Sequence, residues 1–250
     1  MKIVAVSNQK GGVGKSTVAV HLAIALAEAN HKVLFIDLDP QANATKTLEK
    51  WGCKVALNAS ALFDKEPSDF SQAQRLTLIG ADSKMADIER ANTEVLATFK
   101  QKTESIDSFT YCIIDTPPTL GLRMTAALLV ADFALAPIEL EEYSIDGITK
   151  MLQTIFGIKN KWNPKLEFIG MLPNRFNPRS VAQKDTLKSL IGQYSQLLIQ
   201  AHIGIRSSIP EALSQGVPVW DLKKTSAREA AKEYRECLDI IFEKIGAINE

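Results

Sequence analysis

The chain contains 250 residues, of which 46% are hydrophobic and 23% charged, a composition typical of folded globular proteins. This length is sufficient for one α/β domain with a sizeable core, so we expect residues 1–250 to form a single domain. Lysine plus arginine and aspartate plus glutamate each total 29, which excludes binding of nucleic acid through a large overall positive charge. Any DNA binding must therefore come from a local patch or from the association of subunits.

Cysteine usage and apolar runs narrow the class of protein further. Cys53, Cys112 and Cys237 lie far apart without a C-x-x-C pair, which argues against a zinc site or a disulfide framework. Cys112 lies in an apolar run and is expected to be a buried thiol. No signal peptide precedes Lys2, and no apolar run reaches about 18 residues. We expect a cytoplasmic protein that does not insert into a membrane.

The first predicted elements are a strand at 2–7 and an amphipathic helix that starts near Val18, with the segment QKGGVGKST between them. A glycine-rich turn between a strand and a helix can close its backbone N–H groups around a phosphate, and the helix dipole adds attraction. We expect Lys15 to contact the β- and γ-phosphates of a nucleotide and Ser16 to bind Mg²⁺. The alternative is a glycine-rich turn without a ligand. The candidate nucleotide-binding residues of this loop are Gly11, Gly12, Val13, Gly14, Lys15, Ser16 and Thr17.

The second predicted strand covers 32–36 and is followed by the acidic segment DLDPQAN at 37–43. Carboxylates just after the end of a strand lie at the ligand-binding edge of a doubly wound sheet. Asp37 is a candidate for holding Mg²⁺ through water, and Asp39 for orienting or deprotonating the water that attacks the nucleotide. The alternative is structural, because Asp39 followed by Pro40 also fits a helix N-cap with proline at the first helical position.

Residues 51–108 contain no recognisable chemistry, and their pattern predicts a short helix at 61–63, a strand at 76–79 and a charged helix at 88–105. The next predicted strand, at 109–114, ends at Asp115 in the sequence DTPP. A carboxylate after four apolar residues is placed to accept a hydrogen bond from magnesium-bound water. The remaining predicted elements are helices at 121–130, 146–162 and 226–245 and strands at 133–138 and 166–172.

Four motifs follow one another in the order found in one known family. KGGVGKS at 10–16, DLDPQAN at 37–43, DTPP at 115–118 and the Asn-Arg pair at 174–175 resemble the ParA/MinD ATPases, which carry a deviant phosphate-binding loop. Gln9 stands where the common loop has its first glycine. The resemblance implies an α/β fold with a doubly wound, mainly parallel sheet and helices on both faces. It also implies ATP and Mg²⁺ as ligands.

The resemblance assigns roles to individual residues. Lys10 is expected to cross the interface of an ATP-dependent homodimer to the partner's nucleotide, so it joins Lys15 and Asp39 as a candidate catalytic residue. Asn174 is expected to contact the adenine, the alternative being an asparagine in an ordinary turn. Pro210 lies in a segment similar to the family's loop over the base, although its order and spacing are altered here.

The resemblance favours a ParA-type partition ATPase with weak intrinsic turnover. Its ATP-bound dimer is expected to bind DNA on the nucleoid without sequence preference. A ParB-like centromere-binding protein is expected to stimulate hydrolysis and release. Because the chain begins at its first strand, we expect no N-terminal helix-turn-helix of the kind that the larger, operator-binding members carry.

Two groups of surface residues are assigned less specifically. Arg206, Lys184 and Lys188 are candidate DNA-binding residues, since the arginine follows an isoleucine as in the family's DNA surface and the lysines stand at helical spacing. The alternative for the lysines is a solvated surface. Relatives carry a segment similar to P-x-x-x-E-Y near the dimer face, so Glu141 and Tyr143 belong either to that face or to a solvated loop.

Three related functions are alternatives. A MinD-like membrane ATPase would end in a basic amphipathic helix, whereas the predicted helix at 226–245 carries several acidic residues, which an anionic bilayer repels. An iron–sulfur carrier or reductase of the same superfamily would need paired cysteines. An ATPase that positions another cargo is compatible with the sequence.

Overall fold

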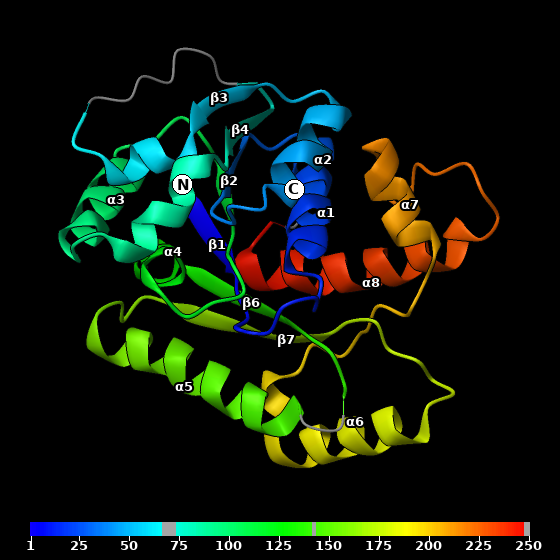
Figure 1. Ribbon diagram of the computed structural model, residues 1–250. Coiled ribbons are helices and arrows are strands. Elements are labelled where there is room, and N and C mark those ends of the chain that lie inside the picture. The colour runs from blue at the N-terminus through cyan, green and yellow to red at the C-terminus, as the bar shows by residue number, and fades with distance from the viewer. Residues whose placement is uncertain (67–73, 142–143, 248–250) are drawn as a thin grey trace.

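The computed structural model describes residues 1–66, 74–141 and 144–247 and contains one seven-stranded sheet flanked by helices (Figure 1). The strand order is β3-β4-β2-β5-β1-β6-β7, and every strand pair within these ranges is parallel. The predicted α/β class with a doubly wound parallel sheet is therefore confirmed. The strands are β1 (Lys2–Val6), β2 (Val33–Asp37), β3 (Val55–Asn58), β4 (Leu76–Gly80), β5 (Tyr111–Asp115), β6 (Phe133–Ile138) and β7 (Glu167–Pro173).

Helices cover both faces of the sheet (Figure 1). One face packs against α1, α2, α7 and α8, and the other against α3, α4, α5 and α6. The helices are α1 (Lys15–Glu28), α2 (Asn43–Trp51), α3 (Glu94–Glu104), α4 (Leu122–Val130), α5 (Ser144–Lys161), α6 (Val181–Tyr194), α7 (Ser208–Gln215) and α8 (Ala227–Ile245). Three short 3₁₀ helices, η1 (Ala59–Phe63), η2 (Ser83–Arg90) and η3 (Ser195–Leu197), complete the described elements.

The central strands are buried on both sides. Side chains alternate along a strand, so Phe35 of β2 packs with the cluster around α1 and α8, whereas Leu34 and Ile36 pack with the cluster around α3, α4 and α5. Every residue of β2 and β5 is buried. Strands that are buried on both faces have nearly continuous apolar sequences, which is why the sequence pattern locates them well.

The structure contains elements that the pattern did not predict, namely β3, α2, α6 and α7. The predicted helix at 88–105 is wrong in its first turns. Residues 83–90 form η2, and α3 begins only at Glu94. The Asn92 side chain accepts a hydrogen bond from the Glu94 amide at 3.1 Å, so the chain turns there before the α-helix starts.

The C-terminal helix α8 is part of the core. Its residues Tyr234, Leu238, Ile241 and Ile245 are buried, as the apolar pattern predicted. No helix in the described part of the chain is long and apolar enough to cross a membrane. The three cysteines are buried free thiols, which confirms the expectation for Cys112.

A histidine lies inside the core on the side of α1 and α8. His21 of α1 is fully buried, and its ring stacks on Tyr234 with the ring centroids 4.2 Å apart. Burial lowers the pKa of His21 to about 4, and the hydrogen bond with the Thr17 carbonyl only partly opposes this. The imidazole is therefore neutral at neutral pH.

We expect acid to destabilise the fold through His21. Its pKa falls from 6.5 to about 4 on folding, so below pH 6.5 the unfolded chain takes up a proton that the folded protein does not. Stability is then lost as the pH falls from 6.5 towards 4, by up to about 3 kcal/mol at 1.36 kcal/mol per unit. Denaturant unfolding of the wild type and of His21→Gln measures this. The stability advantage of the wild type should shrink with falling pH, and a constant difference would contradict the assignment.

Candidate functional site

Two glycines shape the loop between β1 and α1. Gly12 and Gly14 have φ angles of +80° and +89°, a left-handed conformation that favours glycine. A Cβ on Gly14 would lie 2.1 Å from Nδ2 of Asn174, so a larger residue would displace that side chain. The loop leads directly into the N-terminus of α1, where free N–H groups and the helix dipole attract an anion.

Lys15, the first residue of α1, turns its side chain back over the loop. Its Nζ donates a hydrogen bond to the Lys10 carbonyl at 3.1 Å, and the side chain is buried. Burial lowers the pKa of Lys15, whereas the negative charges of Asp115 and Asp39 raise it. A buried ammonium that donates to a neutral carbonyl gains strongly from an incoming phosphate, because hydrogen bonds between charged groups are the stronger ones.

A cavity of about 540 Å³ opens in front of the loop. It brings together predicted residues from the loop, from the segment after β2 and from α7. Those on its wall are Gly11, Gly12, Gly14, Lys15, Ser16, Thr17, Asp39 and Pro210. Val13, also predicted, is fully buried within the loop and is not on the cavity wall. The cavity is large enough for much of a nucleotide, with the phosphate-binding loop at one end.

Sequence reasoning missed one wall of this cavity. Four polar residues of α2 and two residues of α7 form it. They are Asn43, Lys46, Thr47 and Lys50 of α2 and Leu213 and Ser214 of α7. The four α2 residues recur at three- and four-residue spacing, which places them on one face of a helix. A helix predicted at 43–51 would have found them.

Two carboxylates meet at the carboxyl ends of neighbouring strands. Asp37 of β2 and Asp115 of β5 occupy paired positions in the parallel register, and both are fully buried. Burial raises the pKa of Asp115 well above its usual range and the charge of Asp37 adds to this, while Ser16 and Lys15 lower it. Burial also raises the pKa of Asp37. Two buried acids this close need a cation nearby to remain ionised.

The residues around Asp115 fit a magnesium ion. Both of its carboxylate oxygens are buried and, apart from the nearby Ser16 hydroxyl, have no hydrogen-bond partner among the described residues, so the group has unused capacity to accept. Within the same ranges no group of three or more His, Cys, Asp or Glu side chains is placed to enclose a metal. Mg²⁺ characteristically binds one or two carboxylates and takes its other ligands from waters and phosphates. Asp115, Asp37 and Ser16 match this donor set.

The segment after β2 is held by hydrogen bonds to Asp37. Its Oδ2 accepts from the amide and the hydroxyl of Thr45 at 2.9 and 2.7 Å, and its Oδ1 accepts from the Asp39 amide at 3.0 Å. In this conformation Asp37 thus fixes the start of α2. That Asp37 holds Mg²⁺ through water stays a prediction.

The interpretation of Asp39 as a helix N-cap is wrong. The helix begins at Asn43, its N-cap is Ala42, and Pro40 lies outside it. Asp39 Oδ1 instead accepts a hydrogen bond from the Gln41 amide at 3.0 Å, a local turn, and the residue lines the cavity. The candidate role in water positioning is compatible with this location.

Lys10 is paired within its own chain. Its Nζ forms an ion pair with Glu141 and lies 3.8 Å from Glu139, which in turn pairs with Arg175 at 2.7 Å. The hydrogen bond and charge of Lys10 lower the pKa of Glu141. The candidate trans-acting lysine is therefore held on the acidic segment after β6 in this single subunit. Tyr143, the other residue proposed for the dimer face, lies outside the described residues.

Asn174 makes a different contact from the one that the resemblance implies. Its side-chain amide donates to the Val13 carbonyl at 2.7 Å, the residue is only 4% exposed, and it is not on the cavity wall. In this structure Asn174 supports the phosphate-binding loop from below. Contact with the adenine stays a prediction.

The three candidate DNA-binding residues differ in their surroundings. Arg206 is bound to Glu233, with Nη2 and Nε at 2.5 and 3.3 Å from the two carboxylate oxygens. Lys184 and Lys188 are exposed on α6, and Lys188 lies 3.6 Å from Asp185. The lysines are thus accessible to a phosphate backbone, whereas the charge of Arg206 is largely offset.

Comparisons with known proteins identify the family of this chain. The sequence model of a family described as an AAA domain matches residues 1–168. Protein IncC of Escherichia coli is 42% identical over 98% of this chain and 70% of its own length. The chromosome partitioning protein ParA of Caulobacter vibrioides is 29% identical over 95% of this chain and 94% of its own.

A solved structure shows the same fold in a protein with another activity. The cobyrinic acid a,c-diamide synthase of Mycobacterium smegmatis, with bound ADP and magnesium, superposes with a TM-score of 0.75 and is 26% identical. The superposition covers 100% of this chain and 97% of that one. The fold alone therefore does not determine the activity, and the extended identity with IncC and with the chromosome partitioning protein ParA carries the assignment to a family. This chain belongs to the family of ParA/IncC-type partition ATPases, proteins that bind ATP through a phosphate-binding loop.

Proposed function

We propose that this protein hydrolyses ATP as a homodimer on DNA and acts in DNA partition. The observation that carries the proposal is the cavity that joins the glycine-rich loop, Lys15 and Asp39. The similarity to the chromosome partitioning protein ParA of Caulobacter vibrioides over 95% of this chain supports partition rather than another activity of this fold.

Different residues of the site bind the phosphates, hold the magnesium ion and position the attacking water. The loop N–H groups and the Lys15 ammonium bind the β- and γ-phosphates, and Ser16, Asp37 and Asp115 hold Mg²⁺. The ion, when bound, neutralises charge on the phosphates. Asp39 orients the attacking water and accepts its proton. Positioning and electrostatic stabilisation account for most of the catalysis of phosphoryl transfer, so slow turnover is expected until every group is in place.

Dimerisation completes the site in this proposal. Two subunits enclose two ATP molecules, and each contributes Lys10 to the nucleotide of its partner. To do so, Lys10 exchanges its ion pair with Glu141 for phosphate charge. Exposed ion pairs are worth at most about 1 kcal/mol, so this exchange is energetically easy.

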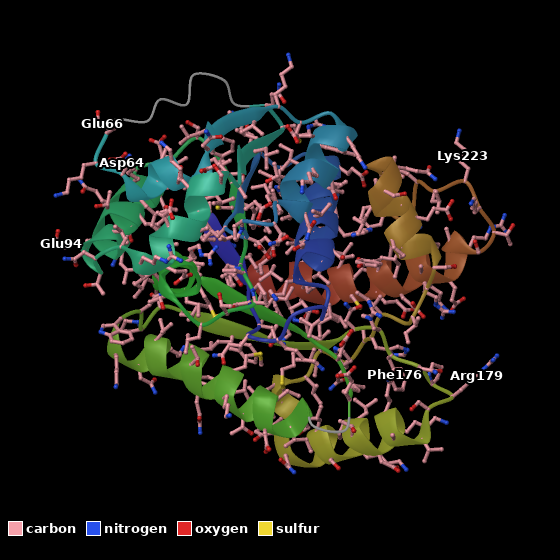
Figure 2. All side chains as sticks on the ribbon, in the orientation of Figure 1. Asp64, Glu66, Glu94, Phe176, Arg179 and Lys223 are labelled. Carbon is pink, nitrogen blue, oxygen red and sulfur yellow. The ribbon has the colours of Figure 1, made fainter. Side chains whose placement is uncertain are left out.

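DNA binding follows from dimerisation because the chain has no net charge. A single subunit presents few cations together, whereas a dimer doubles their number on one surface. Lys184 and Lys188, which are exposed on α6, supply contacts, and Arg206 is the third candidate. Figure 2 also shows Arg179 and Lys223 pointing away from the body of the protein. A ParB-like centromere-binding protein then stimulates hydrolysis and releases the dimer from the nucleoid in the cytoplasm.

Removing the Asp39 carboxylate should trap the ATP-bound dimer. Asp39→Ala should bind ATP and dimerise, yet hydrolyse slowly, because the attacking water loses its orienting group. Fold stability should change little, since Asp39 caps no helix. Steady-state phosphate release and light scattering in the same variant measure both effects. Normal turnover would remove Asp39 from the mechanism.

Salt dependence tests the DNA surface. If each subunit makes roughly three phosphate contacts, the log–log salt slope of a dimer is about −5, at about −0.9 per phosphate. Lys184→Gln with Lys188→Gln should make this slope shallower by about 4 units, because four contacts per dimer are lost. Mobility shifts on unrelated duplexes with ATP or ADP provide the measurement.

The matched control is Lys100→Gln, which neutralises an exposed lysine of α3 that pairs with Glu104. It should leave the slope unchanged. Arg206→Glu is a poorer probe than the lysine pair, because it would place a second carboxylate against the buried Glu233. Equal binding with ATP and ADP, or an unchanged slope in the lysine variant, would contradict the proposed surface.

A further inference from the structure

Both ring nitrogens of His21 have defined partners. Nδ1 lies 2.7 Å from the Thr17 carbonyl, and Nε2 lies 3.1 Å from the Val219 amide nitrogen. A carbonyl only accepts and an amide N–H only donates, so Nδ1 carries the proton and Nε2 the lone pair. The ring is thus a neutral bridge from α1 to the chain segment after α7.

Aromatic neighbours hold the ring in this orientation. It stacks on Tyr234 of α8 and meets Trp220 edge-on, with centroids 5.4 Å apart. The Trp220 indole N–H donates to Glu28 at 3.0 Å, which ties the same segment to the end of α1. His21 cannot rotate without breaking these contacts.

One end of this bridge borders the nucleotide cavity, and the other end follows α7, a helix that also lines the cavity. Thr17, whose carbonyl bonds the ring, lines the cavity next to the loop. Val219 follows α7, and three α7 residues, Pro210, Leu213 and Ser214, line the same cavity. Figure 1 shows α7 beside α1 and α2, above the N-terminal part of α8. The position of α7 therefore sets the width of the cavity.

Two other polar side-chain contacts hold α7 among the described residues, and both come from exposed lysines: Lys224 pairs with Glu211 of α7, and Lys50 contacts its C-terminal end. Lys50 of α2 donates to the Ser214 carbonyl at 3.0 Å from an exposed side chain. Gly216, at the C-cap of α7, packs so closely on α2 that a Cβ would lie 2.3 Å from that of Lys50. Val219 is fully buried, so its N–H has no access to water and depends on the His21 acceptor.

We propose that His21 is a positioning residue of the nucleotide site, which holds α7 against the first turn of α1 and thereby sets the affinity for the nucleotide without touching it. This rests on the proposed nucleotide-binding role of the cavity. An unmet buried N–H is costly, so without the acceptor the segment at 216–219 shifts to satisfy Val219, and α7 moves with it.

Three substitutions separate the acceptor from the bulk of the side chain. His21→Gln reaches the Val219 amide with an amide oxygen, His21→Asn is too short to reach it, and His21→Met has the length of glutamine without an oxygen acceptor. We expect the Asn and Met variants to bind Mg-ATP about tenfold more weakly than the wild type, and the Gln variant within about twofold. In turnover assays KM should rise with kcat unchanged, because no group that contacts the phosphates is altered.

Hydrogen exchange in the nucleotide-free protein tests the positioning itself. The Val219 amide and the amides of α7 should exchange faster in the Asn and Met variants and at the wild-type rate in the Gln variant. Tyr234→Phe is the packing control, since the Tyr234 hydroxyl has no hydrogen-bond partner among the described residues. It should alter neither exchange nor affinity. Because Asn and Met differ in polarity, failure of one of them to fold leaves the other to decide.

The exchange and affinity measurements together distinguish failure of the positioning role from failure of the proposed function. Equal exchange and equal affinity in the Gln, Asn and Met variants would overturn the inference. Faster exchange of α7 with unchanged affinity would overturn its link to the nucleotide. If the wild type itself binds no Mg-ATP, the proposed function fails, whereas unchanged exchange in the Asn and Met variants is what refutes the positioning role of His21.

Discussion

Replacing Lys15 with alanine is expected to abolish measurable ATP binding. Lys15 is the first residue of α1 and lies on the cavity wall, next to the loop that is proposed to receive the phosphates. Hydrogen bonds between charged groups contribute about 1.5–3 kcal/mol each, so losing contacts to two phosphates lowers the affinity by at least about a hundredfold. Calorimetric titration with Mg-ATP measures the loss.

The fold should tolerate this change. Burial lowers the pKa of Lys15, which means that the folded protein without nucleotide accommodates the charge at a cost. Thermal unfolding of Lys15→Ala should therefore resemble that of the wild type. Lys46→Ala is the matched control, because Lys46 also lines the cavity but donates to the Gln41 carbonyl of its own segment. A Lys15→Ala protein that binds ATP as well as Lys46→Ala would refute the phosphate assignment.

The sequence predicted the parts of the fold that depend on short-range patterns. β1, β2 and β5 are continuous apolar runs because they are buried on both faces, and each ends next to a motif. Asp37 and Asp115 end neighbouring parallel strands, so their proximity follows from the topology once the strands are known. This is why the phosphate-binding loop and the magnesium ligands could be proposed together.

The sequence did not predict contacts between residues that are distant along the chain. Arg206 was assigned to a DNA surface, yet Glu233, 27 positions later, accepts two of its hydrogen bonds. Lys10 pairs with Glu141 across 131 positions. Neither partner is implied by local periodicity, because each depends on how separate elements pack. The contact of His21 could not be predicted for the same reason. In the sequence it is one polar residue on an apolar helix face, and its partner, the Val219 amide, is known only from the fold.

Replacing Lys10 with alanine is expected to impair dimerisation and ATP hydrolysis, whereas replacing Lys15 impairs ATP binding. Lys10→Ala should bind ATP nearly as well as the wild type, because the Lys10 side chain is not on the cavity wall of its own subunit. It should fail to form the ATP-dependent dimer, and hydrolysis should fall by about 10³ or more, the effect of a cation supplied in trans in related phosphoryl transfers. Light scattering with ATP and Mg²⁺, together with phosphate release, measures both quantities.

Lys10→Ala also breaks the ion pair with Glu141, so a control must separate the two losses. Glu141→Gln removes the charge of that partner and leaves Lys10 in place. Exposed ion pairs contribute at most about 1 kcal/mol, so this variant should dimerise within about fivefold of the wild-type concentration range. If Lys10→Ala dimerises normally, the trans role is refuted. If both variants lose the dimer equally, the ion pair within the subunit, rather than a contact of Lys10 with the partner's nucleotide, supports the interface.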